Sequence, residues 1–196
     1  MRRKKDYTTI DRKFQERLDY MTTKHRKVLF VRMDPRLPEE TDPNEVKGKI
    51  SRLVSRLKES QKSKGVEIQD VWCREKDTSD VPHYHVVVLA NGSEVQNPKI
   101  ITEDAQRLWQ SITKSDKKGL IDYCSRHRNL DPSKTSSLMI TRPSSRAEGD
   151  ELLRQQAAFN EAKDKARNRV AYLSKTNTKG NVQKREREYG ASEIPK

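Results

Sequence analysis

The stretch from Val66 to Asn91 constrains the fold of this chain more than any other. It holds two runs rich in β-branched and aromatic residues, "VEIQDVWCRE" up to Glu75 and "HYHVVVLAN" from His83, with only the short "KDTSDVP" between them. Such runs are typical of β-strands. Because a parallel connection needs a dozen or more residues, strands joined by so short a loop pair antiparallel. The sequence therefore predicts an antiparallel β-hairpin.

Helices and further strands are expected around this hairpin. Apolar residues at helical spacing predict four helices, over residues 10–21, 42–64, 102–115 and 148–175. Asp42 and Glu45 supply an N-cap and a capping-box acid for the second of these helices, and Gly65 supplies its end. A strand is expected from Lys27 to Asp34, and "GLIDYC" and "SSLMITRP" are candidates for two more.

Charge indicates the class of partner. Lysine and arginine total 42 against 29 acidic residues, a net charge of +13, while only 31% of residues are hydrophobic. Such an excess attracts polyanions, so nucleic acid is the first partner to consider, with a basic solubility coat as the alternative. Cys73 and Cys124 lack CxxC spacing, which favours a reducing compartment. With no signal-peptide core and no apolar run that could span a bilayer, the sequence predicts an intracellular, cytoplasmic protein without a membrane partner.

A candidate metal site lies at the mouth of the hairpin. In a strand, alternate side chains share a face, so His83 and His85 point the same way. Glu75 could pair with His83, in a register whose paired residue numbers sum to 158, or with His85. In either register the Glu75 carboxylate lies beside both imidazoles. This set suits Mg²⁺ or Mn²⁺ with open coordination positions or, on the imidazoles alone, zinc. The alternative is a pair of hydrogen-bonded histidines at a sheet end.

A candidate nucleophile lies near the C-terminus, in "RVAYLSKTNTKG". Lys175 follows Tyr172 by about one helical turn, so the ammonium and the phenol share a face. A nearby ammonium and a metal-polarised phosphate would both favour attack by the phenol oxygen. The alternative is a tyrosine packed at a helix end beside a solvated lysine.

Together these motifs resemble those of HUH endonucleases, and most of all the inovirus-type (filamentous phage, prophage and satellite) replication initiation proteins with a single YxxK tyrosine. The resemblance rests on "VLFVRMDPR", "VWCREKD", "PHYHVVVLAN", "RVAYLSKTNTKG" and "REYGAS". It implies an α+β, ferredoxin-like domain with a central antiparallel β-sheet flanked by helices. It further implies that Glu75, His83 and His85 hold Mg²⁺ or Mn²⁺ and that Tyr172, assisted by Lys175, attacks the scissile phosphodiester.

The expected domain organisation follows from these motifs. Residues 1–25 are expected to form a basic N-terminal helical extension, 26–176 the endonuclease domain and 177–196 a basic tail that is mobile until it meets a partner. Four cations near the proposed site by motif position are candidate DNA contacts: Arg32, Arg74, Lys76 and Arg169.

The expected function is to nick single-stranded origin DNA in rolling-circle replication, leaving a free 3′-OH and a 5′-phosphotyrosine. No GxxxxGK[ST] loop is present, so unwinding and synthesis are expected to depend on a host helicase and polymerase. Two alternatives remain open. One is a noncatalytic basic DNA-binding regulator, and the other is a single-tyrosine transposase or relaxase with the same chemistry.

Overall fold

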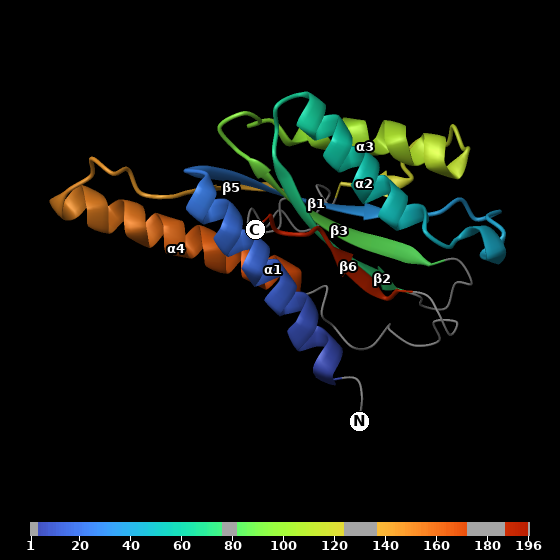
Figure 1. The fold of residues 1–196 in the computed structure, drawn as a ribbon, viewed down its shortest axis with the longest axis horizontal. Helices are drawn as coiled ribbons and strands as arrows, with labels where there is room; N and C mark the ends of the chain where they lie inside the picture. Colours follow the sequence, from blue (N-terminus) through green and yellow to red (C-terminus); the bar gives the residue numbers. More distant parts are fainter. Residues whose placement is uncertain (1–3, 76–81, 124–136, 172–186, 196) are drawn as a thin grey trace.

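The computed structural model describes residues 4–75, 82–123, 137–171 and 187–195, in which a β-sheet is flanked by helices (Figure 1). The elements are α1 (Lys4–Lys24), β1 (Lys27–Pro35), a 3-10 turn η1 (Pro43–Glu45), α2 (Lys49–Ser63), β2 (Ile68–Glu75), β3 (His83–Asn91), α3 (Pro98–Thr113), β4 (Ile121–Asp122), β5 (Ser137–Thr141), α4 (Gly149–Ala171) and β6 (Tyr189–Ala191). The predicted α+β class, with an antiparallel sheet between helices, is confirmed.

The sheet has six strands, with β4-β1-β3-β2-β6 as its main path and β5 paired to the same edge of β1 as β4. Each of these strand pairs is antiparallel. The predicted hairpin is β2–β3, and its register pairs Glu75 with His83 and Cys73 with His85, so the expected sum of 158 is confirmed. On its other side, β3 pairs with β1, which places β3 at the centre of the sheet.

Two hydrophobic cores lie on the two faces of the sheet, because alternate residues of each strand point to opposite faces. In β1, Leu29 and Val31 belong to the core under α2 and α3, whereas Val28 and Phe30 belong to the core under α1 and α4. Figure 1 shows the two helix pairs on opposite sides of the sheet. The N-terminal helix packs on the domain as predicted, burying its apolar stripe of Ile10, Phe14, Leu18 and Met21.

The expected starts of two helices are wrong. Asp42 does not cap α2: its carboxylate accepts a hydrogen bond from the Asn44 backbone N–H, at 2.8 Å, within the turn that includes η1. The helix begins only at Lys49, because Gly48 adopts a left-handed conformation, with φ 75°, that breaks the continuous periodicity. Helix α3 begins at Pro98 rather than Thr102, since Asn97 and Pro98 form an N-cap and first-turn pair.

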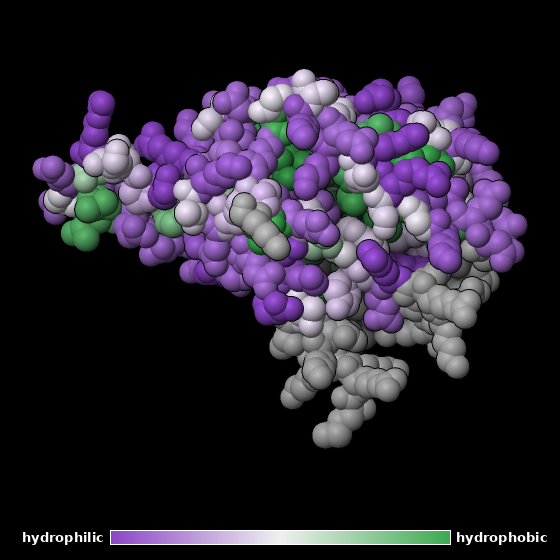
Figure 2. All heavy atoms as spheres, viewed as in Figure 1, coloured by the Kyte–Doolittle hydropathy of each residue, from purple (hydrophilic) through white to green (hydrophobic). Residues whose placement is uncertain are grey.

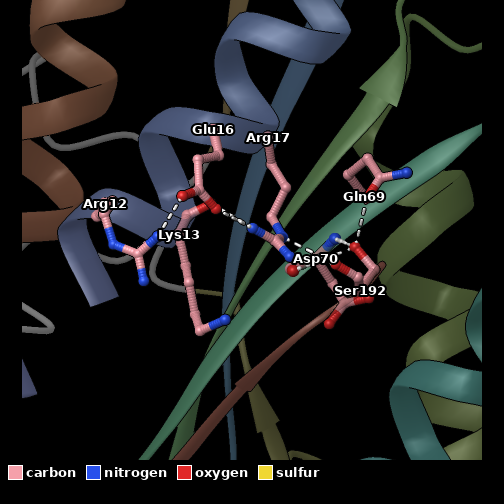
Figure 3. Close-up of polar contacts among 7 residues, drawn as sticks. All are labelled: Arg12, Lys13, Glu16, Arg17, Gln69, Asp70 and Ser192. Atoms are coloured by element: carbon pink, nitrogen blue, oxygen red, sulfur yellow. Dashed lines mark hydrogen bonds and ion pairs between the residues drawn. The ribbon is translucent and has the colours of Figure 1, made fainter. Parts of the chain in front are cut away.

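The expectation of a mobile tail over residues 177–196 is wrong for residues 187–195; residues 177–186 lie outside the described residues. Strand β6 pairs with the edge of β2, and Gly190 makes this possible because a Cβ there would lie 2.6 Å from the Trp72 ring. Figure 3 shows Ser192 beyond β6, approached by Arg17 of α1 and by Gln69 and Asp70 of β2.

Partly buried hydrogen bonds hold this end of the chain. The Arg17 Nε–H donates to the Ser192 carbonyl at 2.9 Å, and the Ser192 hydroxyl donates to Gln69 Oε1 at 2.6 Å. The Asp70 backbone N–H donates to the same hydroxyl at 2.9 Å. These contacts link segments that lie far apart in sequence, and no local pattern predicts them.

Hydrophilic side chains cover most of the molecular face in Figure 2. Large exposed apolar side chains are few among the described residues, and two of them, Leu152 and Leu153, lie at the N-terminal end of α4. Every helix in the described ranges is too short or too polar to cross a lipid bilayer.

Candidate metal centre

The strand register brings three candidate ligands together at one end of the β2–β3 hairpin. Glu75 Oε2 lies 3.0 Å from His85 Nε2 and 3.3 Å from His83 Nε2, and the three ligand atoms all lie within 4.8 Å of one another. The two imidazole rings are nearly perpendicular, with centroids 5.1 Å apart. The prediction that these three side chains meet on one face is confirmed.

The chemistry and spacing of this donor set suit a divalent cation. Ligands at right angles around an ion, with bonds of about 2.1 Å, lie about 3 Å from one another, which matches both contacts of the Glu75 oxygen. One carboxylate and two imidazoles leave other coordination positions open. The side chains of Glu75 and His85 are 9% and 6% exposed, whereas His83 is 31% exposed, so the site opens to solvent on the His83 side.

Asp34, to which the sequence analysis gave no role, extends this centre. Its Oδ1 lies 2.8 Å from His85 Nδ1, so with Nδ1 as the donor the His85 Nε2 lone pair faces Glu75. A carboxylate behind a metal-binding imidazole fixes the ring and its tautomer. In the register of β1 and β3, the numbers of paired residues sum to 119, and 34 and 85 have the same sum. The sequence could therefore have placed Asp34 opposite His85, but only if the pairing of these two strands had been known.

Arg32 also lies in this centre, two residues before Asp34 on the same face of β1. Its Nη2 lies 3.1 Å from Asp34 Oδ2, and its Nε lies 3.3 Å from Asp34 Oδ1. The structure therefore brings Arg32 to the predicted site, where it positions a carboxylate. Its contact with DNA stays a prediction.

The electrostatics favour charged carboxylates here. Burial raises the pKa of Glu75, but hydrogen bonds from His83 and His85 outweigh it, and the pKa lies well below its usual range. Burial likewise raises the pKa of Asp34, which His85 and Arg32 lower on balance. Burial lowers the pKa of His85, but its bonds to Asp34 and Glu75 raise it overall. Without an ion, this network stabilises the imidazolium form of His85; an ion would take the place of its Nε2 proton.

Three predicted site residues, Tyr172, Lys175 and Lys76, lie outside the described residues. Helix α4, described up to Ala171, packs on the face of the sheet that carries the cluster: its Ala166 and Val170 share a core with Phe30 and Val87. The helix that leads toward the predicted nucleophile therefore covers the same face as Glu75, His83 and His85.

The other predicted contacts are divided between the two faces. Near the end of α4, Arg169 lies over the Phe30 ring, 5.8 Å from its centroid, and its Nη1 donates to the Ser137 carbonyl at 3.2 Å. Arg74 lies on the opposite face of β2 from the cluster, with Trp72 and Tyr84, although its position in the motif placed it near the site; its contact with DNA stays a prediction. Adjacent residues of a strand point to opposite faces, which is why Arg74 and Glu75 lie on different faces.

No described histidine adds a fourth ligand. His25 is hydrogen-bonded to Glu67 at 2.8 Å. Glu67 lies just before the start of β2, so this pair is at the opposite end of that strand from Glu75. His127 lies outside the described residues. Within the described ranges, the only group of three or more His, Cys, Asp and Glu residues close enough to hold an ion is Glu75, His83 and His85.

Comparison with known proteins identifies the family. The model of the YagK/YfjJ C-terminal domain matches residues 2–192, nearly the whole chain, so the chain belongs to this family. No curated protein and no solved structure matches it. The matched range includes α1, the candidate metal centre, α4 and β6.

Proposed function

We propose that this member of the YagK/YfjJ C-terminal domain family is a metal-dependent endonuclease that nicks single-stranded DNA at a replication origin and so initiates rolling-circle replication. The observation that carries the proposal is the convergence of Glu75, His83 and His85 at distances that suit one divalent cation. The net charge of +13, which favours a polyanionic substrate, supports it. So does the packing of α4 on the face that carries the cluster.

In the proposed reaction, the Tyr172 oxygen attacks the scissile phosphorus and the bond from phosphorus to the 3′ oxygen breaks. The phenol proton passes to solvent base, and the departing 3′ oxygen takes up a proton to become a free 3′-OH. The 5′ phosphate remains esterified to the tyrosine, and Lys175 stabilises the negative charge of the phenolate. A bound Mg²⁺ or Mn²⁺ would withdraw charge from a phosphate oxygen and orient the diester.

The described residues supply binding and orientation for this reaction. Glu75, His83 and His85 would hold the ion, with Glu75 ionised at neutral pH because its pKa is lowered by both imidazoles. Asp34 fixes the His85 ring by the 2.8 Å contact to Nδ1.

The proposed setting is the bacterial cytoplasm, where a host helicase unwinds the duplex and a host polymerase extends the free 3′-OH.

A second candidate is a noncatalytic DNA-binding regulator. The observation that favours it is an unbroken series of contacts from Asp34 through His85 and Glu75 to His83. These contacts pair the four side chains without any ion. In that case the cluster stabilises one end of the sheet, and the excess positive charge contacts DNA phosphates. Chelators would then leave every activity unchanged.

One experiment separates the two candidates. The protein is incubated with single-stranded DNA from the origin of the element that encodes it, with Mn²⁺ or with EDTA, and a covalent adduct is sought by denaturing electrophoresis. We expect an adduct only with the metal, and none from Tyr172→Phe, which still binds the DNA. Tyr189→Phe, in β6, is the matched control and forms the adduct. Full adduct yield from Tyr172→Phe excludes the proposed nucleophile, and chelator-insensitive binding without any adduct supports the regulator.

A further inference from the structure

A basic pocket lies on the other face of the sheet, where the N-terminal end of α2 meets β2 and β3. It has a volume of about 220 Å³ and is lined by three cationic side chains, Lys47, Arg74 and Arg187. The described residues that line it include no acidic side chain. Three cations and no acid among its described lining residues favour an anion in this pocket.

The first turn of α2 adds to this potential. The N-cap of this helix, Gly48, offers no side-chain hydrogen bond to the first turn, and among its described residues that turn contains no acid. Ile50 and Ser51 of that turn line the pocket. The backbone N–H groups of a first helical turn have no partner within the helix and carry its positive dipole end, a combination that binds phosphate.

The floor of the pocket is aromatic and rigid. Trp72 and Tyr84 are 4% and 2% exposed and meet edge to face, with ring centroids 6.5 Å apart. Burial raises the pKa of Tyr84 to about 12, so its phenol stays neutral and adds no negative charge to the pocket. A buried apolar floor excludes water from one side of the site, which strengthens the attraction between an anion and the surrounding cations.

We propose that this pocket binds a phosphate group of the DNA backbone, as a second contact on the face opposite the metal centre. The identity of the polyanion rests on the proposed function, whereas the anion site itself rests on the pocket and not on cleavage. Arg74 and Glu75 are neighbours on β2 that point to opposite faces, so the two sites lie back to back across the sheet. A DNA molecule held at both is fixed in position and direction relative to the centre.

Ser51→Asp is the sharpest variant for this proposal. An acid in the first turn of a helix stabilises that helix, so the thermal stability of the full-length protein is expected to stay the same or rise. The new carboxylate enters the pocket and repels a phosphate, so we expect the Kd for a fluorescent single-stranded oligonucleotide, measured in EDTA, to rise about tenfold. Unchanged affinity for the oligonucleotide would overturn the proposal.

A charge-removal pair tests the same site through its salt dependence. The double substitution Lys47→Gln with Arg187→Gln removes two of the lining cations, and Arg56→Gln removes an exposed cation from α2 outside the pocket as the matched control. Loss of one single-strand phosphate contact lowers the slope of log Kd against log salt by about 0.7. We expect that change for the double variant only. An equal change of slope in Arg56→Gln would contradict the proposal, because it would mean that any surface cation contributes to DNA binding as much as those of the pocket.

The source of the phosphate is distinguished by titration in EDTA, followed through the backbone amide NMR signals of Gly48, Ile50 and Ser51. A saturable shift with the oligonucleotide supports the proposal, whether or not inorganic phosphate alone also shifts these signals. A response to inorganic phosphate but not to the oligonucleotide, or to neither, overturns it. Because no metal is present and no cleavage is measured, failure of the endonuclease proposal would appear separately, as absence of the adduct.

Discussion

Glu75 and Asp70 are buried carboxylates on one strand, β2, yet their pKa values are shifted in opposite directions. The pKa of Asp70, whose residue is 4% exposed, is raised by burial to about 6. The pKa of Glu75, with a side chain 9% exposed, is lowered because two imidazoles contact its Oε2. Asp70 Oδ2 accepts no hydrogen bond from any residue that the structure describes.

The difference shows that donors, more than depth, decide whether a buried carboxylate stays charged. Burial disfavours the charged form of both groups, and at Glu75 the hydrogen bonds and the charges of two imidazoles reverse the effect. Glu75 is therefore ionised at neutral pH, which is the form that a cation would bind. Ionisation of Asp70 instead destabilises the folded state, because burial raises its pKa. The nearby charges of Lys58 and Arg17 offset this rise only in part.

The largest expected effect comes from Glu75→Gln, which removes the charge but keeps the shape. An ion at such a site contributes several kcal/mol to transition-state stabilisation, so we expect a loss of about 10³-fold in the rate of adduct formation. Mn²⁺ binding, followed by electron paramagnetic resonance, is also lost. The control is Glu67→Gln, which removes another carboxylate paired with a histidine, outside the centre. Wild-type Mn²⁺ affinity in Glu75→Gln would contradict the assignment.

Asp70→Asn is expected to stabilise the fold. The folded-state pKa of about 6 lies above the usual value of 3.8, so the wild-type protein loses stability as pH rises from about 4 to 6, where only the unfolded state releases the proton. The loss amounts to about 3 kcal/mol and is complete above pH 6. Urea unfolding should show the variant more stable by this amount at pH 8 and equal to wild type below pH 4. A constant difference at all pH values would refute this explanation.

Asp34→Asn is expected to weaken the metal centre without abolishing it. Removing a carboxylate behind a ligand histidine lowers metal affinity 10–100-fold. Because Asp34 acts through His85, the proportion of the His85 Nδ1–H tautomer, read from its ring nitrogen NMR signals, should fall as well. Asp42→Asn, in the surface turn before α2, is the matched control. A normal tautomer ratio with weakened binding would mean that Asp34 acts in some other way.

The smallest expected effect is that of Gly190→Ala. The added Cβ meets the Trp72 ring at 2.6 Å, so β6 must shift, at a cost of about 1–3 kcal/mol in urea unfolding. A loosened β6 also lets water approach Asp70, whose backbone contacts Ser192 beyond that strand. The pH dependence attributed to Asp70 should therefore shrink. Full stability in this variant would show that the edge can adjust freely.

Much of the local structure was predictable because it follows from local periodicity. The β2–β3 register and the convergence of Glu75, His83 and His85 follow from one short loop and from the alternation of side chains in strands. Helix starts were less predictable: a capping pattern at Asp42 matched a short turn as well as a helix, and Gly48 delayed the start to Lys49. Motif position placed Arg74 near the candidate centre, but its side chain points to the other face, because adjacent residues of a strand alternate.

By itself, the sequence determined the hairpin, its ligand set, the helical stripes and the excess of positive charge, because each depends on residues a few positions apart. Only the tertiary structure decided that Asp34 lies behind His85, that Ser192 lies between α1 and β2, and that a basic pocket lies behind the candidate metal centre. These features depend on which strands become neighbours. That choice is made by burial of two cores at once, over distances in sequence that local patterns do not record.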